Sequence, residues 1–124
     1  MTFRCKEAFI ALAAEDFERI VGFYTQVFEC EPQPYLANRY AEFRLPGVKL
    51  GVFKPTASHS PEFAAPAYSG WSLCIEVDDL DGAIAHIRNL GYAPPRSITT
   101  ASHGREAYAY DPAGNRLILH ESLE

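Results

Sequence analysis

Side chains that could carry chemistry are few and scattered in this sequence. The histidines are His59, His86, His103 and His120. If residues 116–120 form a β-strand, alternation turns His120 the same way as Ile118, and it places Cys74 and Glu76 on one face of another strand. A metal site of His120 with Glu76 or Cys74 is therefore one interpretation. The simpler one is that His120 is a partly exposed strand-end residue and that Glu76 ends its strand in solvent.

The cysteines give little sign of a reactive site. Cys5, Cys30 and Cys74 are odd in number and widely spaced, and no C-x-x-C pair indicates zinc. They are typical of free thiols in a reducing cytosol. Cys74 could act as a nucleophile only beside a base, and a buried inert thiol is the alternative. No nucleophile elbow, phosphate-binding loop or dinucleotide fingerprint occurs.

Composition narrows the class of protein. The chain has 124 residues, 48% of them hydrophobic, and this suits one globular domain with a core. A net charge of −5 without a basic run disfavours nucleic acid as a partner. No apolar run is long enough to span a membrane, and the N-terminus has no signal-peptide pattern. We expect a cytoplasmic protein.

The chain contains an internal repeat. Residues 9–16 read FIALAAED and residues 72–79 read SLCIEVDD, and a helical pattern of apolar residues follows each. Asp16 and Asp79 are predicted helix N-caps, because their side chains can accept bonds from free amides. Gly91 is a predicted C′ residue after the second helix.

The regions after the two helices also match. Residues 39–53, RYAEFRLPGVKLGVF, resemble residues 105–120, REAYAYDPAGNRLILH. Strict alternation in 105–110 predicts a strand, and Asp111-Pro112-Ala113-Gly114 predicts a type I turn. The segment 92–104 is expected to be a loop with an edge strand near Ile98. We predict one domain over 1–124, with halves at about 1–55 and 71–124 and an ordered linker at about 56–70.

Three segments carry a resemblance to a known family. DFERIVGFY (16–24), EVDDLDGAIAHI (76–87) and DPAGNRLIL (111–119) resemble the vicinal oxygen chelate superfamily of glyoxalases, bleomycin resistance proteins and extradiol dioxygenases. The resemblance implies an α+β fold of two βαβββ repeats, whose curved mixed sheets surround a central cavity. In the family the paired halves come from one chain or from two chains of a dimer.

The resemblance also assigns four metal-ligand positions. In the metal-dependent enzymes they hold His or Glu, whereas here they hold Phe9, Gly51, Ser72 and Ile118. Phe, Gly and Ile have no side-chain donor, and a serine hydroxyl is a poor ligand for zinc, iron or nickel. The sequence therefore predicts no metal and no cofactor at these positions, and it argues against glyoxalase, dioxygenase and thiol-transferase chemistry.

A member without the metal resembles the bleomycin resistance proteins, which hold a ligand in a groove of a dimer. Aromatic strand residues could contact such a ligand, although each could instead be a core or cross-strand partner. Glu42, Arg44, Arg105 and Glu106 could add polar contacts. The predicted ligand-binding residues are Phe9, Phe43, Phe53, Trp71, Ser72, Cys74, Tyr108, Ile118 and His120.

The sequence is compatible with three functions. The first is a metal-independent homodimer that binds a small apolar or aromatic molecule, as antibiotic-sequestering relatives do. The second is a lyase, isomerase or dioxygenase that uses a displaced metal site. The third is a structural or regulatory module that acts through its dimer surface.

Overall fold

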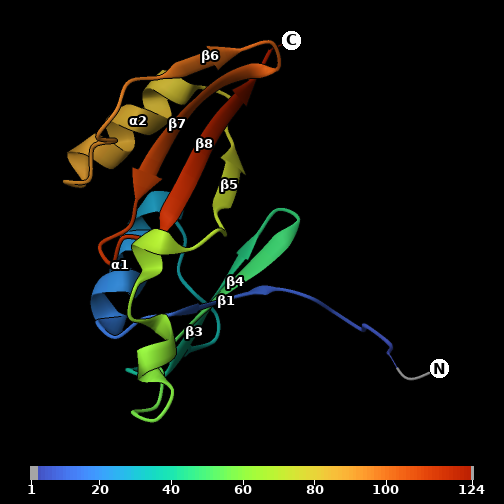
Figure 1. The fold of residues 1–124 in the computed structure, drawn as a ribbon, viewed down its shortest axis with the longest axis vertical. Coiled ribbons are helices and arrows are strands. Elements are labelled where there is room, and N and C mark those ends of the chain that lie inside the picture. The colour runs from blue at the N-terminus through green and yellow to red at the C-terminus, as the bar shows by residue number, and fades with distance from the viewer. Residues whose placement is uncertain (1–2, 124) are drawn as a thin grey trace. The chain divides into compact units, whose positions relative to one another are not determined.

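The element order βαβββ occurs twice along the chain. The computed structural model describes residues 3–123, and the chain divides into two units between Glu62 and Phe63. This boundary falls inside the predicted linker. The linker holds two short 3-10 helices, Ser60–Phe63 and Pro66–Tyr68. Figure 1 follows the two units from the blue N-terminal half to the red C-terminal half. That the halves form one domain stays a prediction.

The first unit is a four-stranded mixed sheet with one helix. Its elements are β1 (Ile10–Ala13), α1 (Phe17–Phe28), β2 (Tyr35–Leu36), β3 (Tyr40–Leu45) and β4 (Val48–Phe53). The strands lie in the order β1-β4-β3-β2. β1 is parallel to β4, and the other pairs are antiparallel. The connection from β1 through α1 is what allows a parallel pair to form.

The second unit repeats this topology. Its elements are β5 (Leu73–Glu76), α2 (Leu80–Asn89), β6 (Thr99–Ala101), β7 (Gly104–Tyr110) and β8 (Arg116–Ser122). The order is β5-β8-β7-β6, with β5 parallel to β8. The edge strand expected near Ile98 is β6. The duplication found in the sequence is thus a duplication of structure, and the predicted α+β fold of two mixed sheets is confirmed.

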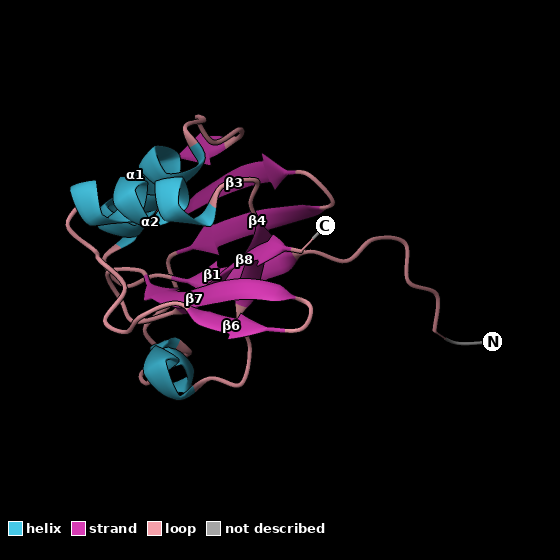
Figure 2. Cartoon of the chain, turned by 90° about the horizontal axis from the view of Figure 1, so that it is seen from above, coloured by secondary structure: helices cyan, strands magenta, loops and turns pink. Residues whose placement is uncertain are grey.

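Alternation along the strands gives each sheet a helix-covered face. In the first unit Phe43 is fully buried, and its ring lies 6.3 Å from that of Tyr24 and 6.4 Å from that of Phe28. Leu50 and Val52 are buried on the same face. In the second unit α2 and its sheet bury Leu80, Ile84, Ile87, Ala107, Ala109, Leu117 and Leu119. The strands and helices of both units are coloured in Figure 2.

The helix ends agree with the sequence in part. The Asp79 side chain accepts a hydrogen bond of 3.1 Å from the Gly82 amide, and Gly91 has a φ of +98°, as the predicted cap and C′ residue require. Asp16 occupies the predicted N-cap position of α1, but the expected hydrogen bond from a free amide to its side chain is not formed. Its ψ of 70° lies short of the extended conformation that N-cap residues adopt.

The turn between β7 and β8 is built around a buried carboxylate. Asp111 accepts hydrogen bonds of 2.9 Å from the amides of Ala113 and Asn115, and one of 2.8 Å from Asn115 Nδ2. Gly114 closes the turn with a φ of +98° and donates to the Asp111 carbonyl. This network fixes where β8 begins.

Within residues 3–123, neither helix has the length and apolar character that a membrane span requires.

Candidate ligand-binding faces

Each sheet has a second face, opposite its helix, which we call the open face. In the first unit, pairing across the strands places Gly51 beside Ala11 and Glu42, and Phe53 beside Tyr40. In the second unit it places Ile118 between Cys74 and Tyr108, and His120 between Glu76 and Glu106. Gly51 and Ile118, two of the family's metal-ligand positions, therefore lie on the open faces.

On the first open face, Tyr40 occupies the space above Gly51. A Cβ atom added to Gly51 would lie 2.7 Å from the Tyr40 hydroxyl oxygen. That hydroxyl donates a hydrogen bond of 3.0 Å to Glu42 Oε1. Burial and the bond to Glu42 raise the pKa of the Tyr40 phenol. The space that a metal-binding side chain at position 51 would need is therefore filled by the phenol of Tyr40, which the Glu42 carboxylate holds in place.

The Glu42 carboxylate forms ion pairs with two basic residues of this face. It is 9% exposed, and its Oε2 lies 3.3 Å from Arg44 and 3.9 Å from Lys49. Lys49 also forms an ion pair with Glu7, and its ammonium lies 5.6 Å from the centre of the Phe9 ring. The predicted metal position Phe9 thus lies just before β1 and forms a cation–π contact.

The second open face carries an apolar row. Cys74, Ile118 and Tyr108 come from three adjacent strands, and the Tyr108 side chain is 42% exposed. Burial, followed by the carboxylates of Glu76 and Glu106, raises the pKa of the Cys74 thiol. The thiol form is favoured, so Cys74 contributes apolar surface to this row. Cys74 is exposed, so the burial expected from the sequence was wrong.

Arg116 holds the segment that leads into β5. Its Nε donates a hydrogen bond of 2.6 Å to the Ser72 hydroxyl, and a second nitrogen donates to the carbonyls of Ser69 (2.9 Å) and Trp71 (3.3 Å). Ser72, the third metal-ligand position, is therefore bound by a guanidinium. Trp71 remains 79% exposed. Nothing in the sequence pattern linked Arg116 to Ser72, because Ser72 precedes β5 and Arg116 begins β8, 44 positions later.

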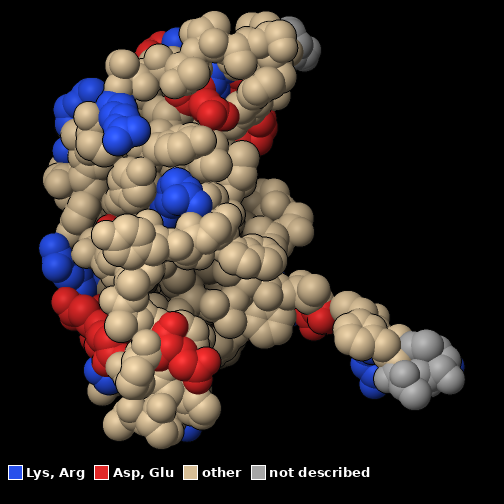
Figure 3. All heavy atoms as spheres, viewed as in Figure 1, with Lys and Arg blue, Asp and Glu red and all other residues tan. Residues whose placement is uncertain are grey.

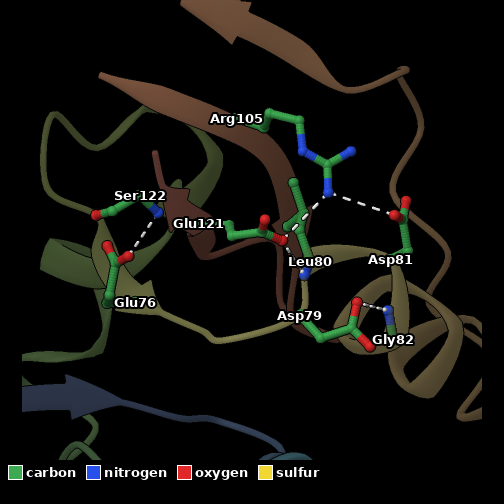
Figure 4. Close-up of polar contacts among 8 residues, drawn as sticks. All are labelled: Glu76, Asp79, Leu80, Asp81, Gly82, Arg105, Glu121 and Ser122. Carbon is green, nitrogen blue, oxygen red and sulfur yellow. Dashed lines mark hydrogen bonds and ion pairs between the residues drawn. The ribbon is translucent and has the colours of Figure 1, made fainter. Parts of the chain in front are cut away.

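Glu76, His120 and His103 form a hydrogen-bonded chain. His120 Nδ1 lies 2.7 Å from Glu76 Oε1, and His120 Nε2 lies 3.0 Å from His103 Nδ1. The Ser122 amide donates to Glu76 Oε2 at 2.7 Å, as Figure 4 shows. The bonds from His120 and Ser122 lower the pKa of Glu76 to about 2. The sequence placed His120 and Glu76 correctly on strands and His103 in a loop, but it did not link His103 to His120.

Two residues expected near a ligand lie on the helix-covered faces instead. Phe43 is fully buried against Tyr24 and Phe28, so its side chain is not available to a ligand, contrary to the prediction. Arg105 bonds to Glu121 (3.1 Å) and Asp81 (3.3 Å), and Glu121 accepts the Leu80 amide at the start of α2 (Figure 4). The bonds from Leu80 and Arg105 lower the pKa of Glu121. Arg105 therefore anchors a helix.

The four positions that the resemblance assigns to metal ligands hold residues with unsuitable side chains. Phe9, Gly51 and Ile118 offer no side-chain donor, and Ser72 is engaged by Arg116. Among residues 3–123, no group of three or more His, Cys, Asp or Glu side chains is arranged to hold a metal ion. Charged residues on the face drawn in Figure 3 are interspersed, so the described part of that face carries no continuous basic surface.

The repeated βαβββ topology defines an α+β protein with two four-stranded mixed sheets. Comparison with sequence models of known families identifies the family. The sequence model of the Glyoxalase/Bleomycin resistance protein/Dioxygenase superfamily matches residues 8–119. The chain belongs to this superfamily. A comparison with curated proteins gave no significant match.

Solved structures share the fold at low sequence identity. The fosfomycin resistance protein FosX from Listeria monocytogenes is 18% identical, with 98% of this chain and 96% of FosX covered and a TM-score of 0.73. Lactoylglutathione lyase from Agrobacterium tumefaciens is 20% identical, with 94% of each chain covered and a TM-score of 0.69. A bleomycin-binding protein complexed with bleomycin is 21% identical, with 96% and 100% covered and a TM-score of 0.66.

Proposed function

We propose that this protein binds a small apolar or aromatic molecule without a metal ion at the family's metal-ligand positions. The observation that carries the proposal is the exposed row of Cys74, Ile118 and Tyr108 on the second open face. An exposed tyrosine ring beside an aliphatic side chain is a surface on which a flat ligand can stack. The bleomycin-binding protein shares this fold and was solved with a bound small molecule.

The charges beside the row indicate which ligands to test first. Glu76 and Glu106 lie next along the same strands, and the whole chain has a net charge of −5. Carboxylates beside an aromatic ring favour a ligand that carries a positive charge. We therefore expect cationic aromatic compounds, bleomycin-type glycopeptides among them, to bind more tightly than anionic aromatic compounds of the same size.

Isothermal titration with matched cationic and anionic aromatic compounds tests this proposal. Tyr108→Ala should weaken binding roughly tenfold, which corresponds to the loss of one aromatic contact. The control is Tyr68→Ala, because Tyr68 is exposed in the linker and lies on neither sheet. If no compound binds, or if both variants bind as the wild type does, the second open face is not the binding surface.

We also make proposals about the oligomeric state of the protein and its location in the cell. We propose a homodimer, since β6 and β2 are edge strands of their sheets and an edge strand can pair with a second copy. Light scattering that gives the mass of a single chain would contradict it.

We propose a cytoplasmic location because Cys5, Cys30 and Cys74 are all free and exposed, as suits a reducing compartment.

A further inference from the structure

Two imidazole nitrogens converge on the second open face. His103 lies in the turn between β6 and β7, and His120 lies near the end of β8. His103 Nδ1 and His120 Nε2 are 3.0 Å apart, and the rings lie nearly parallel with centroids 5.1 Å apart. Nitrogen ligands at about 2.0–2.1 Å from a tetrahedral metal ion are roughly 3.3 Å from each other. The observed separation is close to that of a ligand pair.

The second ring nitrogen of His120 is held by a carboxylate. Because ionised Glu76 can only accept, the bond of 2.7 Å requires that His120 Nδ1 carries the proton. The lone pair of Nε2 then points toward His103. Glu76 is itself held by the Ser122 amide. A carboxylate that orients a histidine through its other nitrogen is the usual support of a histidine that binds a metal.

Gly104 keeps the backbone close to this pair. A Cβ atom at Gly104 would lie 3.1 Å from His120 Nε2 and 2.3 Å from the Glu121 carbonyl oxygen. Its φ of +151° is also one that residues with a side chain rarely adopt. The turn can therefore bring His103 to His120 only with glycine at this position.

We propose that His103 Nδ1 and His120 Nε2 together bind one divalent transition-metal ion, such as Zn²⁺, with Glu76 as the residue that positions His120. Imidazole nitrogen suits zinc, nickel and copper. On binding, the ring proton of His103 moves from Nδ1 to Nε2, and the remaining coordination positions go to water or to a donor atom of a ligand. This site is separate from Phe9, Gly51, Ser72 and Ile118, and it does not depend on the proposed ligand binding.

Zinc titration of the untagged full chain tests the site. We expect one Zn²⁺ per chain for the wild type and no measurable binding for His103→Ala or His120→Ala. Glu76→Gln should weaken binding by about 10–100-fold, the usual effect of losing such a carboxylate. His59→Ala is the matched control, because His59 also bonds to a carboxylate, Glu62, but has no second imidazole bonded to it. It should bind zinc as the wild type does.

Nuclear magnetic resonance of the histidine rings supplies a readout that does not depend on affinity. Zinc should shift the ring signals of His103 and His120 and leave those of His59 and His86 in place. His103 lies in an exposed turn, so His103→Ala should keep the wild-type circular dichroism spectrum. Unchanged zinc binding by folded His103→Ala, or ring shifts confined to other histidines, would overturn the proposal.

Discussion

The hydroxyl of Tyr40 lies 2.7 Å from where the Cβ atom of residue 51 would be if Gly51 were alanine. The two residues come from adjacent antiparallel strands and share the open face of the first sheet. A glycine in the interior of a strand weakens the strand and often marks a close approach by another group. Here the group that approaches is the phenol of Tyr40, which is held in turn by Glu42.

Gly51→Ala should therefore destabilise the protein. The new methyl group would push the Tyr40 ring off Glu42, and we expect a loss of about 1–3 kcal/mol, as for other overpacking substitutions. Urea unfolding measures the change. Adding Tyr40→Ala should remove the clash, so the double variant should cost less than the sum of the two single variants.

Gly22→Ala is the matched control for this prediction. Gly22 lies in α1, and among the described residues a Cβ atom there would meet nothing within 4 Å beyond its chain neighbours and the backbone of its own helix. The substitution should stabilise the protein by about 0.5–1 kcal/mol, because glycine is a poor residue for a helix interior. If both glycine variants change stability in the same direction and by the same amount, the Tyr40 contact is not the cause.

Tyr40 should ionise at higher pH than an ordinary tyrosine. Burial and the Glu42 carboxylate raise its pKa above 10.0, so the folded state holds the proton more tightly than the unfolded state does. Its contribution to stability is complete below pH 10 and is lost as the pH rises through the folded pKa. The difference in ultraviolet tyrosinate absorbance between the wild type and Tyr40→Phe isolates this titration. Glu42→Gln should move it to lower pH, and an unmoved titration would contradict the assignment.

The sequence predicted the elements better than the contacts between them. Periodicity reports which face of an element is apolar, and it correctly placed Ile118, His120, Cys74 and Glu76 on strands with the right alternation. It could not place Phe43, because an aromatic residue in a strand can face either the helix or the open side. Pattern alone leaves that choice to the pairing register.

The polar contacts of the candidate site could not be predicted from the sequence. His103 and His120 are separated by 17 positions, and Arg116 and Ser72 by 44. Such pairs depend on which strands become neighbours and on the length of the turns that join them. The internal repeat gave no help, because the first unit has Phe53 where the second has His120.

Arg116 should control the order of the segment before β5. Arg116→Gln removes the donors to Ser72, Ser69 and Trp71. Because the contacts are partly exposed, we expect a loss of stability of only about 1 kcal/mol, with a larger effect on local motion. Trp71 is the one tryptophan of the chain, so its fluorescence anisotropy reports on this segment directly.

The anisotropy of Trp71 should fall in Arg116→Gln. Ser72→Ala removes only one of the bonds and leaves the two to the backbone carbonyls, so it should lower the anisotropy less. Equal effects of the two variants would mean that the serine hydroxyl alone holds the segment.

Cys74 should react with alkylating reagents more slowly than its exposure indicates. The thiolate is the nucleophile, and burial together with Glu76 and Glu106 raises the pKa of the Cys74 thiol above 9.0. At pH 8 the thiol form therefore predominates, and the rate should keep rising with pH beyond 9. Mass spectrometry of peptides alkylated with iodoacetamide follows Cys74 beside Cys5 and Cys30. Glu106→Gln removes one repelling carboxylate and should speed the reaction of Cys74 alone, whereas an equal acceleration at all three cysteines would show that this carboxylate has no local effect.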